Sequence, residues 1–155
     1  MVYPIVVGIY ICPVAGEKMQ RVQQVKAIAG FGLEDDRYCI GEGSWNVGKP
    51  GTRQVTLMSA RVFKGTPFEY GDARRNIFVE GVELPRLIGE DFQIGEVELR
   101  GFKYCYVCGR PGGISGKPDF VSTFWERGGI IAEITKGGII CTGSQIILPA
   151  KLQTT

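Results

Sequence analysis

Two cysteines spaced by two residues, Cys105 and Cys108, are the clearest candidates for chemistry in the sequence. They belong to the segment 105–110 (CYVCGR), which follows a strand-like run at residues 97–102. A cysteine thiolate attacks electrophiles, carries sulfur and binds soft metals, whereas the protonated thiol does so poorly. The segment therefore predicts thiol chemistry at the end of a strand.

The absence of histidine from all 155 residues narrows that chemistry. No Ser-His-Asp or Cys-His arrangement can form, because no imidazole exists to accept the nucleophile's proton. Catalytic zinc sites built on histidine are excluded for the same reason. Proton transfer near neutral pH would have to use a carboxyl, lysine, tyrosine or thiol with a shifted pKa, or a cofactor's own atoms.

Arginines accompany three of the short segments that carry polar residues. Asp36 and Arg37 end the segment 32–37, Arg53 begins a strand-like run, and Arg75 and Asn76 follow one another in a third segment. Each has a simple structural interpretation: a surface ion pair worth about 0–1 kcal/mol, or solvated arginines on an edge strand. The cysteine motif likewise reads as two half-buried thiols.

Length, charge and cysteine count bound the class of protein. A chain of 155 residues corresponds to a single domain, here 1–155. A net charge of +2 with both signs mixed does not indicate a nucleic-acid or lipid partner. No apolar run approaches the roughly 18 residues of a membrane helix, and residues 1–4 have no basic start before the apolar stretch, so a cleaved secretory signal is not expected. Five cysteines, an odd number, favour reduced thiols and a cytoplasmic location.

Alternating or branched apolar runs separated by glycine-centred turns predict a mainly β fold. Two pairs of runs suggest hairpins: residues 92–99 around Gly95-Glu96, and residues 130–134 with 139–141 across a Gly-Gly turn. Further strands are expected at 5–11, 22–28, 54–58, 75–79 and 146–148, short helices at 60–64 (capped by Ser59), 83–88 and 122–127, and a loop at 41–51. This spacing favours a barrel-like antiparallel sheet with a few short helices.

Together these segments resemble the MOSC domain family, to which the C-terminal domain of molybdenum cofactor sulfurase belongs. The resemblance runs from about residue 6 to residue 148. Its blocks are Gly32-Leu33-x-x-Asp36-Arg37, 53–57 (RQVTL), 75–77 (RNI), 87–89 (LIG) with Phe92-x-Ile94-Gly95 and Leu99, Cys108, 127–129 (RGG), and Gly138-x-Ile140. The chain departs from the family pattern at Asp35, Val107 and Ser144.

The resemblance implies a MOSC-type β-barrel that binds molybdenum cofactor (molybdopterin). Cys108 would carry sulfur as a persulfide or ligate molybdenum, with Cys105 in an optional upstream position. Arg37, Arg53, Arg75 and Asn76 would line a pocket for an anionic ligand. Such a protein would serve molybdoenzyme maturation or reduce N-hydroxylated compounds, with a cysteine desulfurase, a molybdoenzyme or an electron donor as partner.

Elementary chemistry agrees with this assignment. Cations such as Arg37, Arg75 or Arg110 near a thiol favour its ionised form, and a thiolate suits a metal held mainly by a dithiolene. The guanidinium fork fits a pterin phosphate or ring carbonyl. Trp45 and Trp125 could stack on a flat pterin, and Asp36 could hold Arg37 in position.

Three alternatives stay open. The Cys-x-x-Cys spacing permits a redox dithiol module, although the motif follows a strand and is not expected to open a helix. A structural zinc site would need a second pair, for which Cys12, Cys39 and Cys141 are not spaced. A binding scaffold without catalysis would fit the departures at Asp35, Val107 and Ser144. Exposed sheet edges leave a homodimer open.

Overall fold

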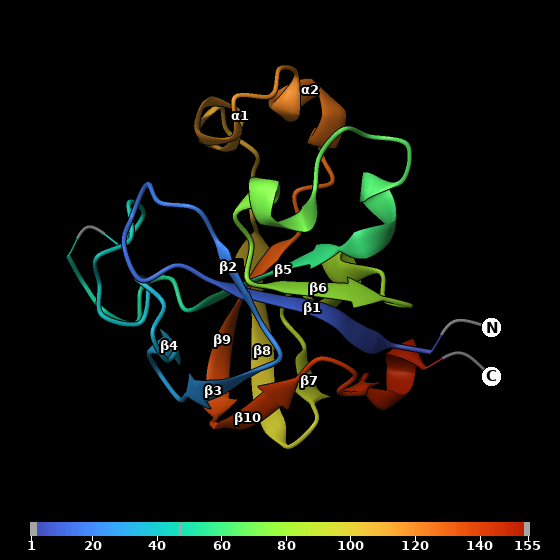
Figure 1. Cartoon of the computed structure of the whole chain (residues 1–155). Coiled ribbons are helices and arrows are strands. Elements are labelled where there is room, and N and C mark those ends of the chain that lie inside the picture. Colours follow the sequence, from blue (N-terminus) through green and yellow to red (C-terminus); the bar gives the residue numbers. More distant parts are fainter. Residues whose placement is uncertain (1–2, 47, 154–155) are drawn as a thin grey trace.

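The computed structural model describes residues 3–46 and 48–153, and strands dominate it (Figure 1). Its strands are β1 (Ile5–Ile11), β2 (Gln20–Val22), β3 (Gln24–Ile28), β4 (Gly32–Leu33), β5 (Val55–Ser59), β6 (Ile77–Glu80), β7 (Asp91–Ile94), β8 (Val97–Tyr104), β9 (Ile130–Lys136), β10 (Gly138–Cys141) and β11 (Ile146–Ile147). The α-helices are α1 (Arg110–Ser115) and α2 (Phe120–Phe124). One-turn 3₁₀ helices are η1 (Ala60–Phe63), η2 (Tyr70–Ala73), η3 (Leu84–Leu87) and η4 (Ala150–Leu152).

The strands form a large curved sheet and a small one. The large sheet has the order β11-β7-β8-β9-β5-β6-β1-β2, and the small sheet has the order β10-β3-β4. Only β5 and β6 pair in parallel among the paired strands of the described chain. The Val6 amide donates to the Ser144 carbonyl at 3.0 Å, and the Gly143 amide donates to the Val6 carbonyl at 2.8 Å. The large sheet thus curls back on itself, which confirms the predicted barrel-like, mainly β fold.

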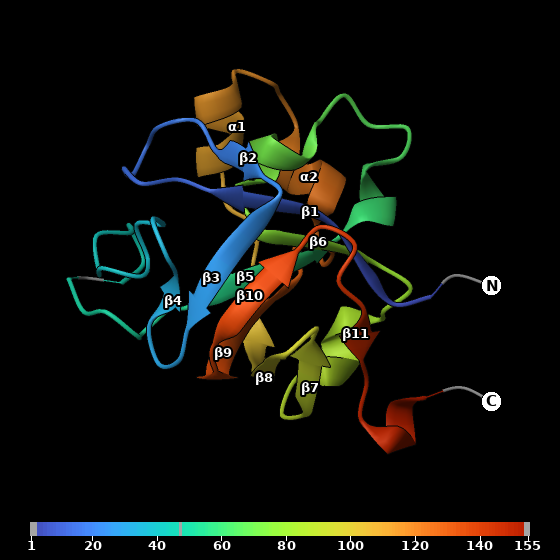
Figure 2. The ribbon, with the colours of Figure 1, turned by 60° about the horizontal axis from the view of Figure 1, so that its bottom comes forward.

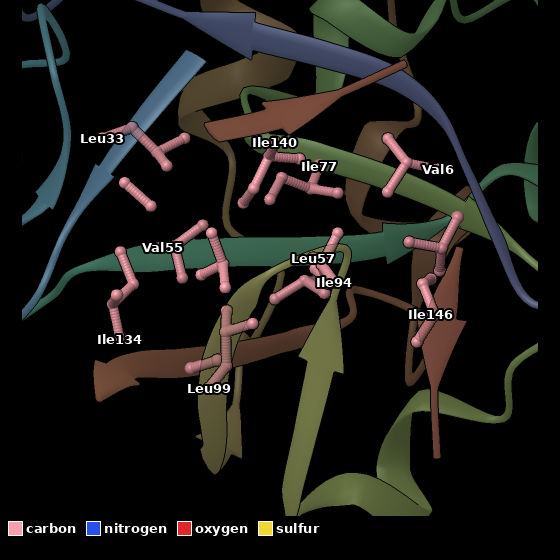
Figure 3. Close-up of a cluster of buried hydrophobic side chains, with 14 of the residues drawn as sticks. Val6, Leu33, Val55, Leu57, Ile77, Ile94, Leu99, Ile134, Ile140 and Ile146 are labelled. Carbon is pink, nitrogen blue, oxygen red and sulfur yellow. The ribbon is translucent and has the colours of Figure 1, made fainter. Parts of the chain in front are cut away.

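The interior of the curved sheet is aliphatic. Figure 3 shows side chains from strands of both sheets pointing into one interior, among them Val6, Leu33, Leu57 and Ile140. Alternation along each strand sends every second side chain there, and Leu57 is fully buried. Full burial of such a side chain stabilises the fold by about 1.5–3 kcal/mol.

A second, aromatic cluster attaches the helices to the outside of the large sheet. Phe78 follows Ile77 in β6 and points to the opposite face, where it joins Phe63, Phe120 and Phe124. The rings of Phe63 and Phe124 lie 4.8 Å apart, so η1 and α2 pack against each other. In Figure 1, α1 and α2 sit together at one end of the molecule. This cluster fixes the end of the fold where the cysteine segment leaves β8.

One predicted hairpin is wrong. The run at 130–134 does not pair with that at 139–141, because both edges of β9 are taken by β5 and β8. β10 pairs instead with β3, and Figure 2 shows the two strands side by side. A Cβ at Gly137 would lie 2.5 Å from the Ala27 carbonyl oxygen, so only glycine lets the chain cross over there. The expected strand at 22–28 is likewise divided between the two sheets, as β2 and β3.

The helices differ from expectation in three places. Ser59 precedes η1 without a side-chain capping bond, and α2 begins two residues before the expected 122–127. No helical pattern predicts η2 or α1, and the Arg-Pro-Gly-Gly that begins α1 is a poor helix former. Pro111 is nevertheless acceptable in the first turn, and Gly109 is the residue that precedes α1. The cysteine motif therefore does lead into a helix, contrary to the prediction.

Within the described residues, no helix has the length and apolar character needed to cross a membrane.

Candidate functional site

Cys108 lines a small cavity whose walls are dominated by arginine. Arg37, Arg53 and Arg75, which the family resemblance assigns to a ligand pocket, line it together with Arg110. The remaining lining residues are Arg74, Tyr38, Ser44, Trp45 and Pro111, and the cavity volume is about 30 Å³. Five guanidiniums around one half-buried thiol create a strongly positive site.

Arg75 ties the cysteine segment to the sheet. It is only 5% exposed, and its Nε donates to the Gly128 carbonyl at 2.9 Å. Its Nη2 donates to the Cys105 carbonyl at 3.2 Å and the Tyr106 carbonyl at 3.4 Å, and its Nη1 donates to the Ala73 carbonyl at 3.3 Å. Burial lowers the pKa of Arg75, and its attraction to the sulfurs of Cys105 and Cys108 partly opposes that shift. One side chain therefore holds the loop that presents Cys108.

Two glycines make this close approach feasible. A side chain at Gly128 would clash with the Cys105 carbonyl and crowd Arg75. Gly129 has φ = 90°, and a Cβ there would clash with the Leu57 carbonyl. The Gly-Gly pair singled out in the sequence thus packs the loop against the start of β9 and against β5.

Arg53 reaches the same loop through a side-chain contact. Its Nη2 donates to Cys105 Sγ at 3.1 Å, and Cys105 is only 2% exposed. The guanidinium carbon lies 5.0 Å from the centre of the Tyr38 ring. The buried Nε of Arg53 has no hydrogen-bond partner among the described residues. A buried donor without a partner costs about 1–3 kcal/mol, so this atom marks a local strain in the wall of the site.

The pair Asp36–Arg37 is buried, so the expectation of a surface ion pair is wrong. Asp36 Oδ1 lies 3.3 Å from Arg37 Nη1, and it also accepts a hydrogen bond from the Cys12 amide at 2.9 Å. Asp36 Oδ2 accepts from the Tyr38 amide at 3.2 Å. These bonds offset part of the cost of burying the carboxylate. Asp36 thereby orients Arg37, whose guanidinium carbon lies 4.5 Å from the centre of the Tyr38 ring.

Asp36 gives a pH-dependent prediction. Burial raises the pKa of Asp36 above its ordinary 3.8, although Arg37 and the Cys12 and Tyr38 amides act in the opposite direction. A raised folded-state pKa contributes stability that is complete below pH 3.8 and is lost as the pH rises through the folded-state pKa. As the pH rises from 3.8 through the folded-state pKa, we expect the free energy of unfolding of the wild type to fall relative to that of Asp36→Asn. Urea titrations at a series of pH values measure this difference. A stability difference that does not change with pH would contradict this.

Arg74 is a charged cavity residue that the sequence analysis did not assign to the site. It is buried in the left-handed conformation with φ = 58°, which is uncommon outside glycine. Burial lowers the pKa of Arg74, and the nearby charge of Arg37 lowers it further. The only signal available was its position next to Arg75.

Asn76 and Trp125 lie elsewhere. Asn76 Oδ1 accepts from the Thr56 amide at 3.1 Å, and Asn76 Nδ2 donates to the Tyr10 carbonyl at 3.1 Å. Asn76 thus connects the backbones of β5 and β1 and does not line the cavity. Trp125 lines a different cavity with Tyr104 and Tyr106. Trp45 does line the thiol cavity and is 56% exposed.

The five cysteines differ in their surroundings. All five are free, and Cys105 faces Arg53 while Cys108 faces the cavity. Across residues 3–46 and 48–153, no group of three or more histidine, cysteine, aspartate or glutamate side chains is placed to hold a metal. The structural zinc alternative therefore finds no ligand set in this part of the chain.

The chain matches a known protein family. The family model described as MOSC domain matches residues 52–147, which include Arg53, Arg75 and Cys108 but not Arg37. No curated protein sequence matches the chain.

Three similar solved structures share the fold. The YuaD protein from Bacillus subtilis has a TM-score of 0.77 at 18% identity, with 94% of each chain covered. YiiM from Escherichia coli has a TM-score of 0.68 at 14% identity, covering 100% of this chain and 73% of that one. YiiM from Geobacillus stearothermophilus has a TM-score of 0.62 at 16% identity, covering 96% and 74%. With the family model matching more than half of its residues, the chain belongs to the MOSC domain family.

Proposed function

We propose that this protein binds molybdenum cofactor and that the Sγ atom of Cys108 faces the cofactor's metal. The observation that carries the proposal is the cavity in which one half-buried thiol shares its walls with five arginines. A thiolate is a soft ligand suited to such a metal, and guanidiniums pair well with the phosphate and pterin carbonyl of the cofactor.

The size of the cavity limits which part of the cofactor it holds. A volume of about 30 Å³ admits little more than a water-sized group. The cofactor would therefore lie outside this volume, with its metal end toward Cys108. When bound, the cofactor would supply the electron or sulfur chemistry. The chain's own residues would hold it: Arg75 positions the cysteine loop, and Arg37, Arg53 and Arg110 balance the negative charge.

Cofactor content tests this proposal. Protein co-produced with the cofactor biosynthetic machinery should retain pterin, measured as its fluorescent oxidation product per protein molecule. Because Arg110 is exposed and lines the cavity, we expect Arg110→Gln to retain about fivefold less pterin, the effect of one exposed ion pair. Arg86→Gln removes a similarly exposed arginine in η3, outside this cavity, and should retain the wild-type amount. Wild-type protein without pterin above the level of an unrelated protein would contradict the proposal.

Cys108 has a second role within the same proposal, that of a sulfur carrier. A desulfurase persulfide would donate its outer sulfur: the Cys108 thiolate attacks that sulfur, the S–S bond breaks, and the desulfurase cysteine leaves as a thiolate. After incubation with a cysteine desulfurase and free cysteine, peptide mass spectrometry should find one added sulfur atom on Cys108. The buried Cys12 and Cys105 should stay unmodified. Sulfur spread over several cysteines, or absent from Cys108, would remove this role.

Both roles allow the same cellular uses. Sulfur or cofactor delivery to a molybdoenzyme and the reduction of N-hydroxylated compounds with an external electron donor would each employ this thiol. Five free cysteines are consistent with the reducing cytoplasm.

A further inference from the structure

A second, much larger cavity lies beside the thiol cavity. Its volume is about 730 Å³, within the range of small-molecule sites, and η2 with Ile114, Ser115 and Lys117 forms part of its wall. Arg74 lines both cavities. The buried, left-handed Arg74 thus stands between the cysteine site and this open space.

The charges in the large cavity are unbalanced toward positive. Its cations are Lys18, Arg21, Arg74 and Lys117, and its acids are Glu69 and Asp72. Lys117 Nζ pairs with Asp72 Oδ2 at 2.6 Å, so these two charges compensate each other. Three cations then face one carboxylate, that of Glu69. Arg74 is crowded by Arg37 as well, so an added anion would relieve repulsion between like charges.

Aromatic side chains form the other part of the wall. Tyr70 stacks on Phe78 with the ring centres 4.8 Å apart and the planes 11° from parallel. Tyr10 meets Phe78 edge-on at 5.4 Å, and Arg21 lies 5.8 Å from the centre of the Tyr10 ring. Because Phe78 is fully buried, it holds both tyrosines in place. The cavity therefore combines a fixed aromatic wall with an excess of cations: Arg21 donates to the Val7 carbonyl and Arg74 donates to the Glu17 carbonyl, but neither forms an ion pair within the described residues.

We propose that this cavity binds a small organic anion carrying a flat ring, of the aromatic carboxylate class. The ring would pack against Tyr10 and Tyr70, and the carboxylate would lie among Lys18, Arg21 and Arg74. The site needs no cofactor, so the inference goes beyond the proposed function and stands or falls separately from it.

Titration of the cofactor-free protein with benzoate, followed by amide NMR shifts, tests the site. We expect saturable shifts at Met19, Gly71 and Ser115, which line the cavity, and weaker binding of the neutral benzamide. Lys18→Glu should raise the benzoate Kd about tenfold, because it removes one attraction and adds one repulsion at an exposed position.

Lys26→Glu is the matched control, since it makes the same charge change at an exposed position in β3 outside the cavity. It should leave the benzoate Kd within about twofold of wild type. Equal weakening by the two variants would overturn the proposal, because the effect would then follow net charge alone. Benzamide binding as tightly as benzoate, or shifts confined to other regions, would overturn it too.

Discussion

Arg75→Leu should lower the free energy of unfolding by at least about 3 kcal/mol. The guanidinium is buried and donates to four backbone carbonyls, those of Ala73, Cys105, Tyr106 and Gly128. A hydrogen bond to a charged group contributes about 1.5–3 kcal/mol, and a buried carbonyl left without a donor costs about 1–3 kcal/mol. These contributions overlap, so their full sum is not expected. Urea unfolding followed by circular dichroism measures the loss.

Two further variants keep this prediction testable if Arg75→Leu fails to fold. Arg75→Lys keeps the charge but lacks the planar fork, so it should still lose stability, by less than leucine does. Arg100→Leu removes an exposed arginine whose ion pair with Asp91 is also exposed, and its cost should stay within about 1 kcal/mol. Arg75→Lys as stable as wild type would show that the carbonyl contacts do not hold the loop.

Local structure could be predicted where the signal is local. The branched apolar run at 5–11 is β1 with the same bounds, and the turn at Gly95-Glu96 does join β7 to β8. The partner of β10 could not be predicted in this way. Pairing depends on which sheet edges are already occupied, and both edges of β9 are filled by strands distant in sequence.

The candidate site could likewise be predicted only in part. The resemblance to a family selected Cys108, Arg37, Arg53 and Arg75, and all four line one cavity. Residue type alone could not show that Asn76 would bridge backbones, because an asparagine amide serves either purpose. Nor could it show that Arg74 would be buried beside Arg75, since adjacent residues in an extended segment normally point to opposite sides. The left-handed conformation of Arg74 alters that alternation.

The second large effect concerns the thiol itself. Cys108→Ser should lower the molybdenum retained per protein molecule at least about tenfold, comparable to the 10–100-fold effect of losing a residue that supports a metal ligand. Serine preserves the size of the side chain, but its hydroxyl is neither ionised at neutral pH nor a soft ligand. Cys141→Ser is the control, because Cys141 is also a half-buried free cysteine but lies in β10, outside the cavity.

Elemental analysis of the three proteins, each purified without oxygen from cells that make the cofactor, is the decisive measurement. Wild type and Cys141→Ser should carry equal, substantial amounts of molybdenum, while Cys108→Ser should be nearly free of it. Equal molybdenum in all three proteins, or none in any of them, would mean that the thiol among the arginines is not where this protein meets the metal.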